Sequence, residues 1–206
     1  MATHISVIDK RVHHRRCDWG IAAVAPDRMV VDGSSALADV LAKIKTAAGQ
    51  DQLVMLSILA HGFGHKAADG KMYGGFGVEF CKENIDLQTV KQFQALRGMF
   101  ASKTLGIELI GCGAAAQYRF KTAAGGWITG FGWRLCKALA AFTQTGVKAS
   151  SELQDVDLKR YAYAIRVRGL PTEVSDTCAD PGKWEGQVWI FTPDGQVRKA
   201  PGTASK

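Results

Sequence analysis

The sequence predicts a single α/β domain with a mostly parallel central sheet flanked by helices. Three observations lead to this prediction. Short apolar runs typical of buried strands alternate along the chain with stretches of helical periodicity. Two of these runs, 53–60 and 105–111, end directly in His61-Gly62 and Cys112-Gly113. Of the 206 residues, 47% are hydrophobic, which is enough for one substantial core.

The first part of the chain predicts strands at 4–8, 28–31 and 52–60. Residues 20–25 are predicted as a further short strand, or as the partner of 28–31 in a hairpin turning at Pro26-Asp27. A helix is expected from a cap at Ser34 or Ser35 to about Ala48, with Gly49 as its stop. The apolar stripe of this helix comprises Leu37, Val40, Leu41, Ile44 and Ala48. The glycine-rich stretch 62–85 is expected to be a loop with a small hairpin at 76–80.

The second part continues the alternation. Asp86 is expected to cap a helix whose inward residues are Leu87, Val90, Phe93 and Leu96. A strand at 105–110, a loop at 113–126 and a helix at 127–142 follow, the helix with Ile128, Phe131, Leu135, Cys136 and Leu139 inward. Strands are predicted at 147–150 and 161–167, and a terminal hairpin at 187–191 and 196–198 turns through Pro193-Asp194-Gly195. Residues 1–200 are predicted as the domain and 201–206 as a flexible tail.

Charge and cysteine content narrow the class of protein. The net charge is +7, and part of it lies in one short run, Lys10, Arg11, His13, His14, Arg15 and Arg16. Because no aromatic residues interleave this run, a solvated loop is favoured over a nucleic-acid site, and nucleic acid is disfavoured as a partner. The five cysteines, Cys17, Cys81, Cys112, Cys136 and Cys178, are odd in number and form no CxxC pair. This argues against a disulfide framework or a zinc site.

Targeting and cofactor signals are absent from the sequence. No apolar run approaches the ~20 residues of a membrane helix, and the first residues lack a signal-peptide pattern. The default expectation is a cytoplasmic protein with no membrane partner, although secretion by another route stays open. No GxGxxG or Walker loop follows the first strand, and no metal motif is evident, so neither a cofactor nor a metal is expected.

His61 and Cys112 are the candidate catalytic residues. Each ends a predicted strand, and chemistry in open α/β sheets collects beyond the carboxyl ends of the strands. An imidazole next to a thiol accepts its proton and later protonates a leaving amine. Gly62 allows a sharp turn after His61 and an N–H group directed at a substrate oxygen, and Gly111 and Gly113 allow close backbone approach to Cys112. His65 ends no strand, and Cys81 and Cys136 are expected to be packing residues.

The order and spacing of these motifs resemble the caspase-like cysteine peptidases (clan CD), which include caspases, clostripain, gingipains, legumain and separase. "LSILAHGFG" (56–64) precedes "ELIGCGAA" (108–115), and Cys112 lies 51 residues after His61. A histidine about 50 residues before the cysteine is a caspase spacing. The caspase pentapeptide around the cysteine is absent, and the chain looks closer to bacterial caspase-like domains. Those continue with a helix and a short strand ending in Ala-Ser, as "GWRLCKALAAFTQTGVKASSE" (132–152) does here.

The resemblance implies a three-layer caspase-like sandwich that ends in a β-hairpin, here "WEGQVWIFTPDGQV" (184–197). It implies a cysteine endopeptidase with His61 and Cys112 as the dyad and the N–H groups of Gly62 and Cys112 as the oxyanion hole. Protein or peptide substrates and a thioester acyl-enzyme follow. Self-processing at Lys and Arg sites within 113–126 or 158–168 is a further expectation.

The substrate pocket and two other functions stay open. Ser150, Ser151, Glu152 and Asp155 follow the predicted strand at 147–150 and are candidate pocket residues, with an exposed polar loop as the alternative. An acidic pocket there would select Lys or Arg before the scissile bond. The first alternative function is a Cys/His acyltransferase or deamidase. The second is a catalytically silent caspase-like binding or signalling module.

Overall fold

A seven-stranded sheet forms the centre of the fold. The computed structural model describes residues 3–12, 28–152, 157–167, 170–180, 184 and 186–201, with the backbone alone for 157–180. The strands of the sheet are β1 (Thr3–Asp9), β2 (Arg28–Val31), β3 (Leu53–Leu59), β8 (Ile107–Ile110), β11 (Val147–Ser150), β14 (Val188–Phe191) and β15 (Val197–Lys199). Their order is β15-β14-β11-β8-β3-β1-β2.

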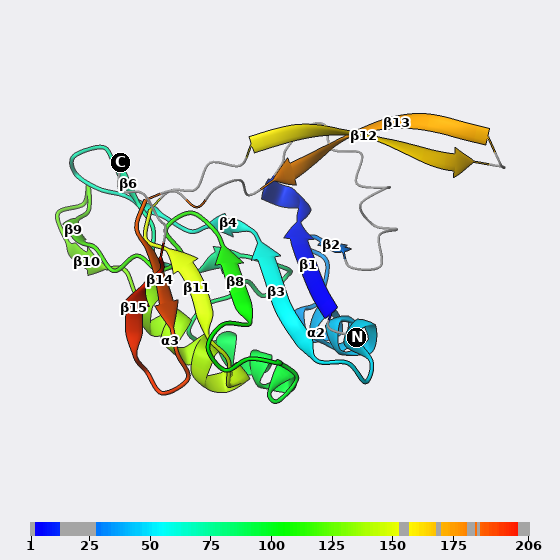
Figure 1. Ribbon diagram of the computed structural model, residues 1–206. Helices are drawn as coiled ribbons and strands as arrows, with labels where there is room; N and C mark the ends of the chain where they lie inside the picture. The colour runs from blue at the N-terminus through cyan, green and yellow to red at the C-terminus, as the bar shows by residue number, and fades with distance from the viewer. Residues whose placement is uncertain are drawn as a thin grey trace.

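The sheet is mostly parallel, as predicted. β2, β1, β3, β8 and β11 pair in parallel, while β14 is antiparallel to both β11 and β15. Figure 1 shows the arrowheads of β1, β3, β8 and β11 pointing toward one edge of the sheet. The predicted strands at 4–8, 28–31, 52–60, 105–110 and 147–150 and the terminal hairpin are confirmed. Because β2 pairs in parallel with β1, it extends the sheet, and the alternative strand at 20–25 lies outside the described residues.

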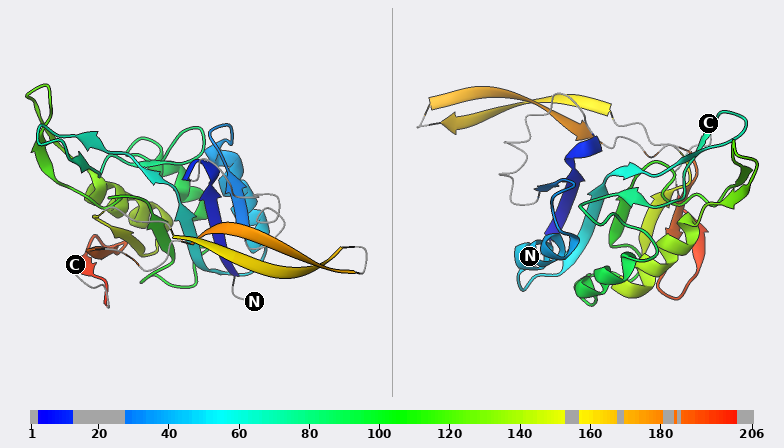
Figure 2. Two further views of the ribbon diagram at one scale, coloured as in Figure 1. Left: turned by 90° about the horizontal axis from the view of Figure 1, so that it is seen from above. Right: turned by 180° about the vertical axis from the view of Figure 1, so that it is seen from behind.

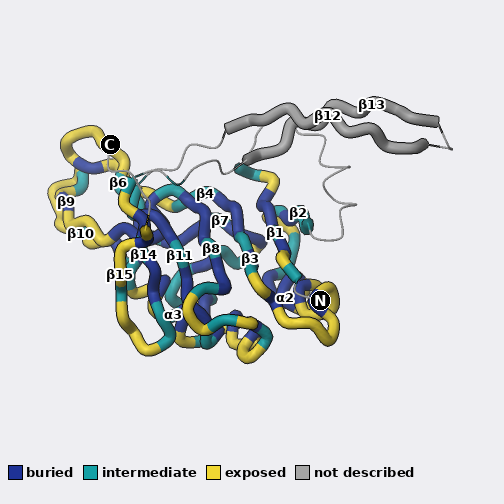
Figure 3. Tube along the Cα trace, viewed as in Figure 1, coloured by how far each residue is buried: buried dark blue, intermediate teal, exposed yellow. Residues whose placement is uncertain are grey.

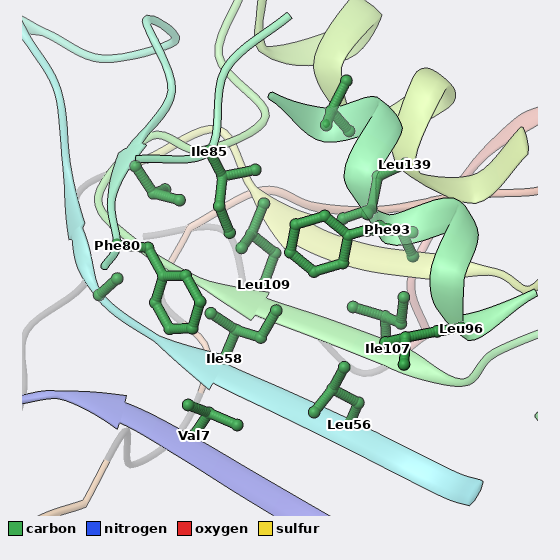
Figure 4. Packing of buried hydrophobic residues seen from close by; sticks show 14 of the residues in the cluster. Val7, Leu56, Ile58, Phe80, Ile85, Phe93, Leu96, Ile107, Leu109 and Leu139 are labelled. Carbon is green, nitrogen blue, oxygen red and sulfur yellow. The ribbon is translucent and has the colours of Figure 1, made fainter. Parts of the chain in front are cut away.

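One face of the sheet carries the helical layer. α2 (Leu37–Ala48), the 3-10 helix η2 (Val90–Leu96) and α3 (Gly132–Thr143) bury their apolar residues in a single cluster with the inward residues of the strands. Figure 4 shows Phe93 of η2 next to Leu109 of β8, and Leu96 of η2 next to Ile107 of β8. The three segments lie behind the sheet in Figure 1 and in front of it in the rear view of Figure 2. A second helical layer, as the three-layer arrangement requires, is not found among the described residues.

The other face of the sheet carries a polar row. Side chains alternate between the faces of a strand, so residues between the inward apolar positions point the opposite way. Ser57, Glu108 and Lys148 are direct partners across β3, β8 and β11. The Ser57 hydroxyl donates to Glu108 at 3.3 Å, and the Lys148 ammonium donates to Glu108 at 3.1 Å. This row pairs its own charges across neighbouring strands, and Lys148 also lies over the ring of Trp184 at 4.7 Å.

α2 begins without the predicted serine cap. Its N-cap residue is Ala36, which provides no side-chain hydrogen bond, and the Leu37 N–H donates to the Glu83 carboxylate at 2.8 Å. A side chain from a distant loop therefore performs the capping that Ser34 or Ser35 was expected to provide. The predicted end of this helix is confirmed, because Gly49 has a φ of +61° and its N–H donates to the carbonyls of the last turn.

The predicted helices after Asp86 and at 127–142 differ from the structure. The Asp86 carboxylate accepts from the N–H groups of Gln88 and Thr89, but the helix that follows is the 3-10 segment η2. The second helix begins only at Gly132, so Ile128 and Phe131 precede it. Residues Trp127–Thr129 form strand β10, which pairs antiparallel with β9 (Arg119–Lys121). Within the loop predicted at 113–126, β9 is the only strand, and the remaining residues form turns and irregular chain.

The glycine-rich stretch 62–85 contains short strand pairs rather than a loop. β4 (His61–Gly62) pairs with β7 (Val78–Glu79), and β5 (His65–Lys66) pairs with β6 (Met72–Tyr73). The predicted hairpin within 76–80 is therefore wrong, because β7 finds its partner at the end of β3. β12 (Asp157–Val167) and β13 (Leu170–Asp180) form a separate antiparallel pair. Within the described residues, no helix has both the length and the apolar character to cross a membrane.

Candidate active site

His61 and Cys112 leave the sheet at matched positions. β3 and β8 are neighbouring parallel strands, and Leu59 pairs with Ile110 at their carboxyl ends. His61 lies two residues after Leu59, and Cys112 lies two residues after Ile110. Both residues are half-buried. The structure thus places the imidazole-bearing and thiol-bearing residues next to each other along one edge of the sheet, the edge at which β4 lies in Figure 1.

The backbone at Gly62 touches the backbone of Cys112. A Cβ atom at position 62 would lie 1.9 Å from the Cys112 carbonyl oxygen and 3.0 Å from its nitrogen. No side chain fits in that space, so the sequence His-Gly after β3 is a requirement of this approach. Because residue 62 is in contact with Cys112, the preceding residue, His61, is held beside the cysteine.

The N–H group of Gly62 faces the cysteine side of β4. Gly62 is the strand partner of Val78, and the Phe63 N–H donates across the pair to the Gly77 carbonyl at 2.9 Å. Successive residues of an antiparallel strand direct their N–H groups to opposite edges. The Gly62 N–H therefore points away from β7, and its nitrogen is 3.7 Å from the place of a Cβ on Gly111. This position is compatible with the predicted role of Gly62 as an oxyanion donor.

The ring of His61 is held by a backbone carbonyl. Its Nε2 lies 2.9 Å from the carbonyl oxygen of Arg11, which follows the end of β1. A carbonyl oxygen only accepts hydrogen bonds, so Nε2 is the nitrogen that carries the proton. In a neutral imidazole the other nitrogen, Nδ1, is then the basic one. The contact with Arg11 therefore assigns the roles of the two ring nitrogens.

Arg11 is itself fixed by a buried carboxylate. Asp9, fully buried at the end of β1, accepts from Arg11 Nε at 2.8 Å and Nη2 at 2.6 Å, and from the Cys81 N–H at 3.0 Å. Arg11 Nη1 donates to Glu79 at 3.1 Å, and Nη2 also donates to the Cys81 carbonyl. The hydrogen bond with Asp9 raises the pKa of Arg11 above its ordinary value. We call Asp9, Arg11 and Glu79 the arginine clamp.

The arginine clamp corrects one expectation from the sequence. The basic run was predicted to be a solvated loop, but the Arg11 side chain is only 26% exposed and forms two ion pairs. Lys10 pairs with Asp32 at 2.5 Å. The other members of the run, His13, His14, Arg15 and Arg16, lie outside the described residues.

The loop that carries the cysteine is tied to the end of β11. The Gly113 N–H donates to the Glu152 carbonyl at 2.7 Å, and the Ala115 N–H donates to the Ser150 carbonyl at 2.8 Å. Ala114 and Ala115 are fully buried beneath these bonds. The structure therefore brings the predicted pocket segment after β11 next to the cysteine loop.

The four candidate pocket residues are placed differently from one another. Ser150 is fully buried, and its hydroxyl accepts from the Glu152 N–H at 3.0 Å and donates to the Gln187 carbonyl at 3.4 Å. Ser151 is half-buried and donates to the same carbonyl at 3.2 Å. Both hydroxyls thus bond to the chain that leads into β14. Asp155 lies outside the described residues.

Glu152 directs its carboxylate to the segment that follows the cysteine loop. Its Oε1 accepts from the Tyr118 hydroxyl at 2.6 Å. The pKa of Tyr118 is raised above its ordinary value, first by burial and second by the hydrogen bond to the Glu152 carboxylate. The Tyr118 side chain is 39% exposed, so the pair lies at the surface. Glu152 is the pocket candidate whose charge the structure places beside the cysteine loop.

The other candidate nucleophiles and bases occupy different environments. Cys81 is fully buried, and burial raises the pKa of its thiol to about 12. Burial also raises the pKa of Cys136, which lies on the inward face of α3 as predicted. Cys17 lies outside the described residues, as does the side chain of Cys178. His65 is exposed on β5, with its ring 4.4 Å from that of Phe76.

Sequence reasoning missed the arginine clamp and Tyr118. Asp9 carried the same signal as His61, since it is a polar residue at the end of an apolar strand. The role of Asp9 depends on its contact with Arg11 and on the contact of Arg11 with Glu79. No local sequence pattern connects Glu79 to the other two residues. No group of three or more metal-ligating side chains occurs in the part of the chain that the structure describes.

Comparison of the chain with protein-family models, with curated proteins and with solved structures finds no match. The likeness to caspase-like peptidases therefore rests on the motifs of this chain alone. Since a fold does not specify a function, the residues at the site are what bear on the chemistry of this chain.

Proposed function

We propose that this protein is a cysteine endopeptidase that uses His61 and Cys112. One observation carries the proposal. The two residues end adjacent parallel strands, and the Arg11 carbonyl holds His61 Nε2 so that Nδ1 is the basic nitrogen. A thiol beside an oriented imidazole, with backbone N–H groups close by, is the minimum arrangement for acyl transfer through a thioester.

The reaction follows from these roles. His61 Nδ1 takes the thiol proton of Cys112, and the thiolate attacks the carbonyl carbon of the scissile peptide. The Gly62 and Cys112 N–H groups donate to the oxygen that becomes negative. The C–N bond breaks as His61 returns its proton to the leaving amine, which leaves a thioester on Cys112. Water then attacks the thioester and gives its proton to His61. The carboxylic product leaves, and the thiol recovers its proton.

The test is alkylation of Cys112 at low pH, where an ordinary thiol reacts slowly. We expect iodoacetamide at about pH 6 to label Cys112 rapidly, because an unperturbed thiol with a pKa near 8.5 is almost wholly protonated there. The protein used carries Cys17→Ser and Cys178→Ser, so that only cysteines of known surroundings remain. Cys81 and Cys136 serve as internal controls, since both are buried with raised pKa values.

Two variants and a cleavage assay separate the proposal from its alternatives. Cys112→Ala should abolish the fast labelling, and His61→Ala should slow it by about 10²-fold or more. A mixture of unlabelled peptides, analysed by mass spectrometry, then reports cleavage. Fast labelling without cleavage of any peptide would favour an acyltransferase or deamidase. Labelling of Cys112 no faster than that of a free cysteine would sink the peptidase proposal and favour a binding module.

The surface carboxylate of Glu152 predicts the substrate preference. A negative group held beside the cysteine loop favours a basic residue before the scissile bond. We expect Glu152→Gln to lower kcat/KM for peptides with Arg or Lys at that position by about tenfold, and to change little for peptides with Leu there. Tyr118→Phe removes only the hydrogen bond to the carboxylate and is the matched control. An equal loss for both classes of peptide would contradict the prediction.

A further inference from the structure

Two hairpins beside the candidate site join into one small antiparallel sheet. β5–β6 and β9–β10 meet through a bridge between Ala67 and Thr122, and the Ala68 N–H donates to the Lys121 carbonyl at 2.8 Å. The order of strands in this sheet is thus β6-β5-β9-β10. Figure 2 shows the two hairpins extending from one end of the molecule, away from the central sheet.

The register decides which side chains share a face of this small sheet. Directly opposed residues point to the same face, and neighbours along a strand point to opposite faces. Lys66 is opposed to Met72, and Lys121 is opposed to Trp127. Since Ala67 is opposed to Thr122, Lys66 and Lys121 both lie on the face opposite to that pair, together with Arg119. We call this set, Lys66, Met72, Arg119, Lys121 and Trp127, the hairpin face.

The opposite face of the small sheet packs against the body of the protein. Ala67 is 5% exposed and Phe120 is 6% exposed. The ring of Tyr73 stacks on Phe120 at 4.6 Å, and Phe76 packs edge-on against both Phe120 and Phe131. The hairpin face is therefore fixed outward. All five of its residues are exposed, and Figure 3 shows the region of β9 and β10 as largely exposed.

The hairpin face combines large apolar side chains with positive charge. Met72 is 53% exposed and Trp127 is 61% exposed, which are the two highest values among the exposed large hydrophobic residues of the described chain. Arg119 lies over the ring of Trp127 at 5.1 Å. In residues 63–76 and 117–131 the only acidic residue is Asp69, whose carboxylate accepts from Lys71 N–H and Tyr73 hydroxyl. Within the described residues none of the three cations of the face forms an ion pair.

We propose that the hairpin face binds an acidic, partly apolar polypeptide segment. Exposed Trp, Met and Arg side chains on one face favour a protein–protein contact, because these residue types are enriched where such contacts are strongest. Complementary charge on the segment is required, because Lys66 on β5 and Arg119 and Lys121 on β9 lie between Met72 on β6 and Trp127 on β10. The three cations lie on two neighbouring strands between the apolar residues and do not form the longer basic track that a nucleic-acid backbone needs, which favours polypeptide as the ligand.

The position of the face gives such binding a use. Phe63 and Gly64 connect β4, which carries His61, to β5. Residues 113–118 connect Cys112 to β9. A protein segment held on the hairpin face would be tethered next to the candidate active site. The proposal goes beyond peptide hydrolysis, because it concerns binding and does not require that Cys112 react.

The test measures binding of a defined peptide to the Cys112→Ala protein, which cannot cleave the probe through that thiol. The probe is a fluorescein-labelled peptide of alternating glutamate and leucine, followed by fluorescence anisotropy. A peptide with lysine in place of glutamate and a single-stranded DNA oligonucleotide of equal charge are the comparison ligands. We expect saturable binding of the acidic peptide that weakens as salt is raised.

Two double variants locate the binding. Lys66→Glu/Lys121→Glu should weaken binding by about tenfold or more, and Met72→Ala/Trp127→Ala, which leaves the charge unchanged, by a similar factor. Lys43→Glu/Lys91→Glu reverses two exposed charges on α2 and η2 and should leave binding within about twofold. Absence of saturable peptide binding, tighter binding of DNA, or equal loss in the control variant would each overturn the proposal. Since the reactive thiol is absent, none of these outcomes depends on the peptidase proposal.

Discussion

Two backbone carbonyl groups set the arrangement of the candidate site. The Arg11 carbonyl accepts from His61 Nε2, and the Cys112 carbonyl occupies the space that a side chain at Gly62 would need. Neither contact depends on the identity of the residue that provides the carbonyl. Each depends on where the backbone lies, so the residues that position those two backbone segments are the ones whose substitution should affect the site most.

Substitution of Gly62 should damage the site directly. In Gly62→Ala the new methyl group would lie 1.9 Å from the Cys112 carbonyl oxygen, so β4 or the cysteine loop must move. We expect the rate of Cys112 alkylation to fall by about tenfold or more, and the free energy of unfolding to fall by about 2 kcal/mol. Gly126→Ala is the control, because its nearest neighbour would be 3.8 Å away. Unchanged alkylation in Gly62→Ala would show that the approach of the two segments is not needed.

Substitution of Asp9 should loosen the ring of His61 indirectly, through Arg11. Asp9→Asn leaves the Arg11 guanidinium without its buried counter-charge, which costs about 3 kcal/mol of stability in comparable buried pairs. We expect Cys112 alkylation to slow several-fold, because the Arg11 carbonyl no longer holds His61 Nε2 in place, and its pH profile to shift. Glu79→Gln is the matched control, since Glu79 is 32% exposed and accepts only one bond from Arg11. If Cys112 alkylation slows equally in both variants, the proposed role of Asp9 in positioning His61 is wrong.

At the scale of elements, long-range partners decide where several elements begin. Glu83 caps α2 from a loop that is 46 residues away in sequence. β10 forms because β9 lies beside it, which delays the start of α3 to Gly132. β7 pairs with β4, and its Val78 also bridges Ile85, instead of forming a hairpin within 76–80. In each case the local pattern is compatible with another structure, and the partner that decides between them comes from elsewhere in the chain.

The cap on α2 can be measured by substitution. Glu83→Ala removes the acceptor of the Leu37 N–H and a negative charge at the N-terminus of the helix, so we expect a loss of about 1 kcal/mol in urea unfolding. Asp39→Asn removes a charge from the same turn of the helix without removing that bond, and should cost less. Equal losses would mean that the charge matters and the hydrogen bond does not.

At the scale of the whole molecule, the sheet separates the candidate site from the main core. The helical layer and the main core cover one face, while the carboxyl edge of the parallel strands carries His61 and Cys112. A hollow of about 430 Å³ near Lys103 and the turn between β14 and β15 lies at the opposite edge of the sheet. Two of the thiols, Cys81 and Cys136, belong to the core rather than to the edge that carries His61 and Cys112.

The buried thiols should make the fold sensitive to alkali. Burial raises the pKa of Cys81 from 9.0 to about 12. Between these values the unfolded chain loses a proton that the folded chain keeps, so stability is full below pH 9 and falls as pH rises toward 12. The loss is at most about 1.4 kcal/mol per pH unit for one thiol. Urea unfolding between about pH 8 and about pH 10.5 should show a shallower decline for Cys81→Ala. Val78→Ala, which creates a cavity without removing an ionisable group, should keep the original slope.

The sequence by itself determined the mostly parallel sheet and the positions of His61 and Cys112 at the carboxyl ends of its strands. Strand-forming runs are local signals, because burial on both faces requires consecutive apolar residues. The same runs showed where His61 and Cys112 leave the sheet, since each is the first reactive side chain after an apolar strand. The stripe of α2 and its stop at Gly49 were also local, and the structure confirms both.

Only the tertiary structure decided what surrounds those two residues. Three hydrogen bonds around the site join residues that lie 2 to 50 positions apart in the sequence. They run from Arg11 to Asp9, from His61 to the Arg11 carbonyl, and from the Tyr118 hydroxyl to Glu152. The hairpin face likewise exists only because Ala67 meets Thr122 across two separate hairpins. Hydrophobic periodicity reports which face of an element is buried, but it does not report which other element covers that face. That pairing is set by the packing of the whole chain.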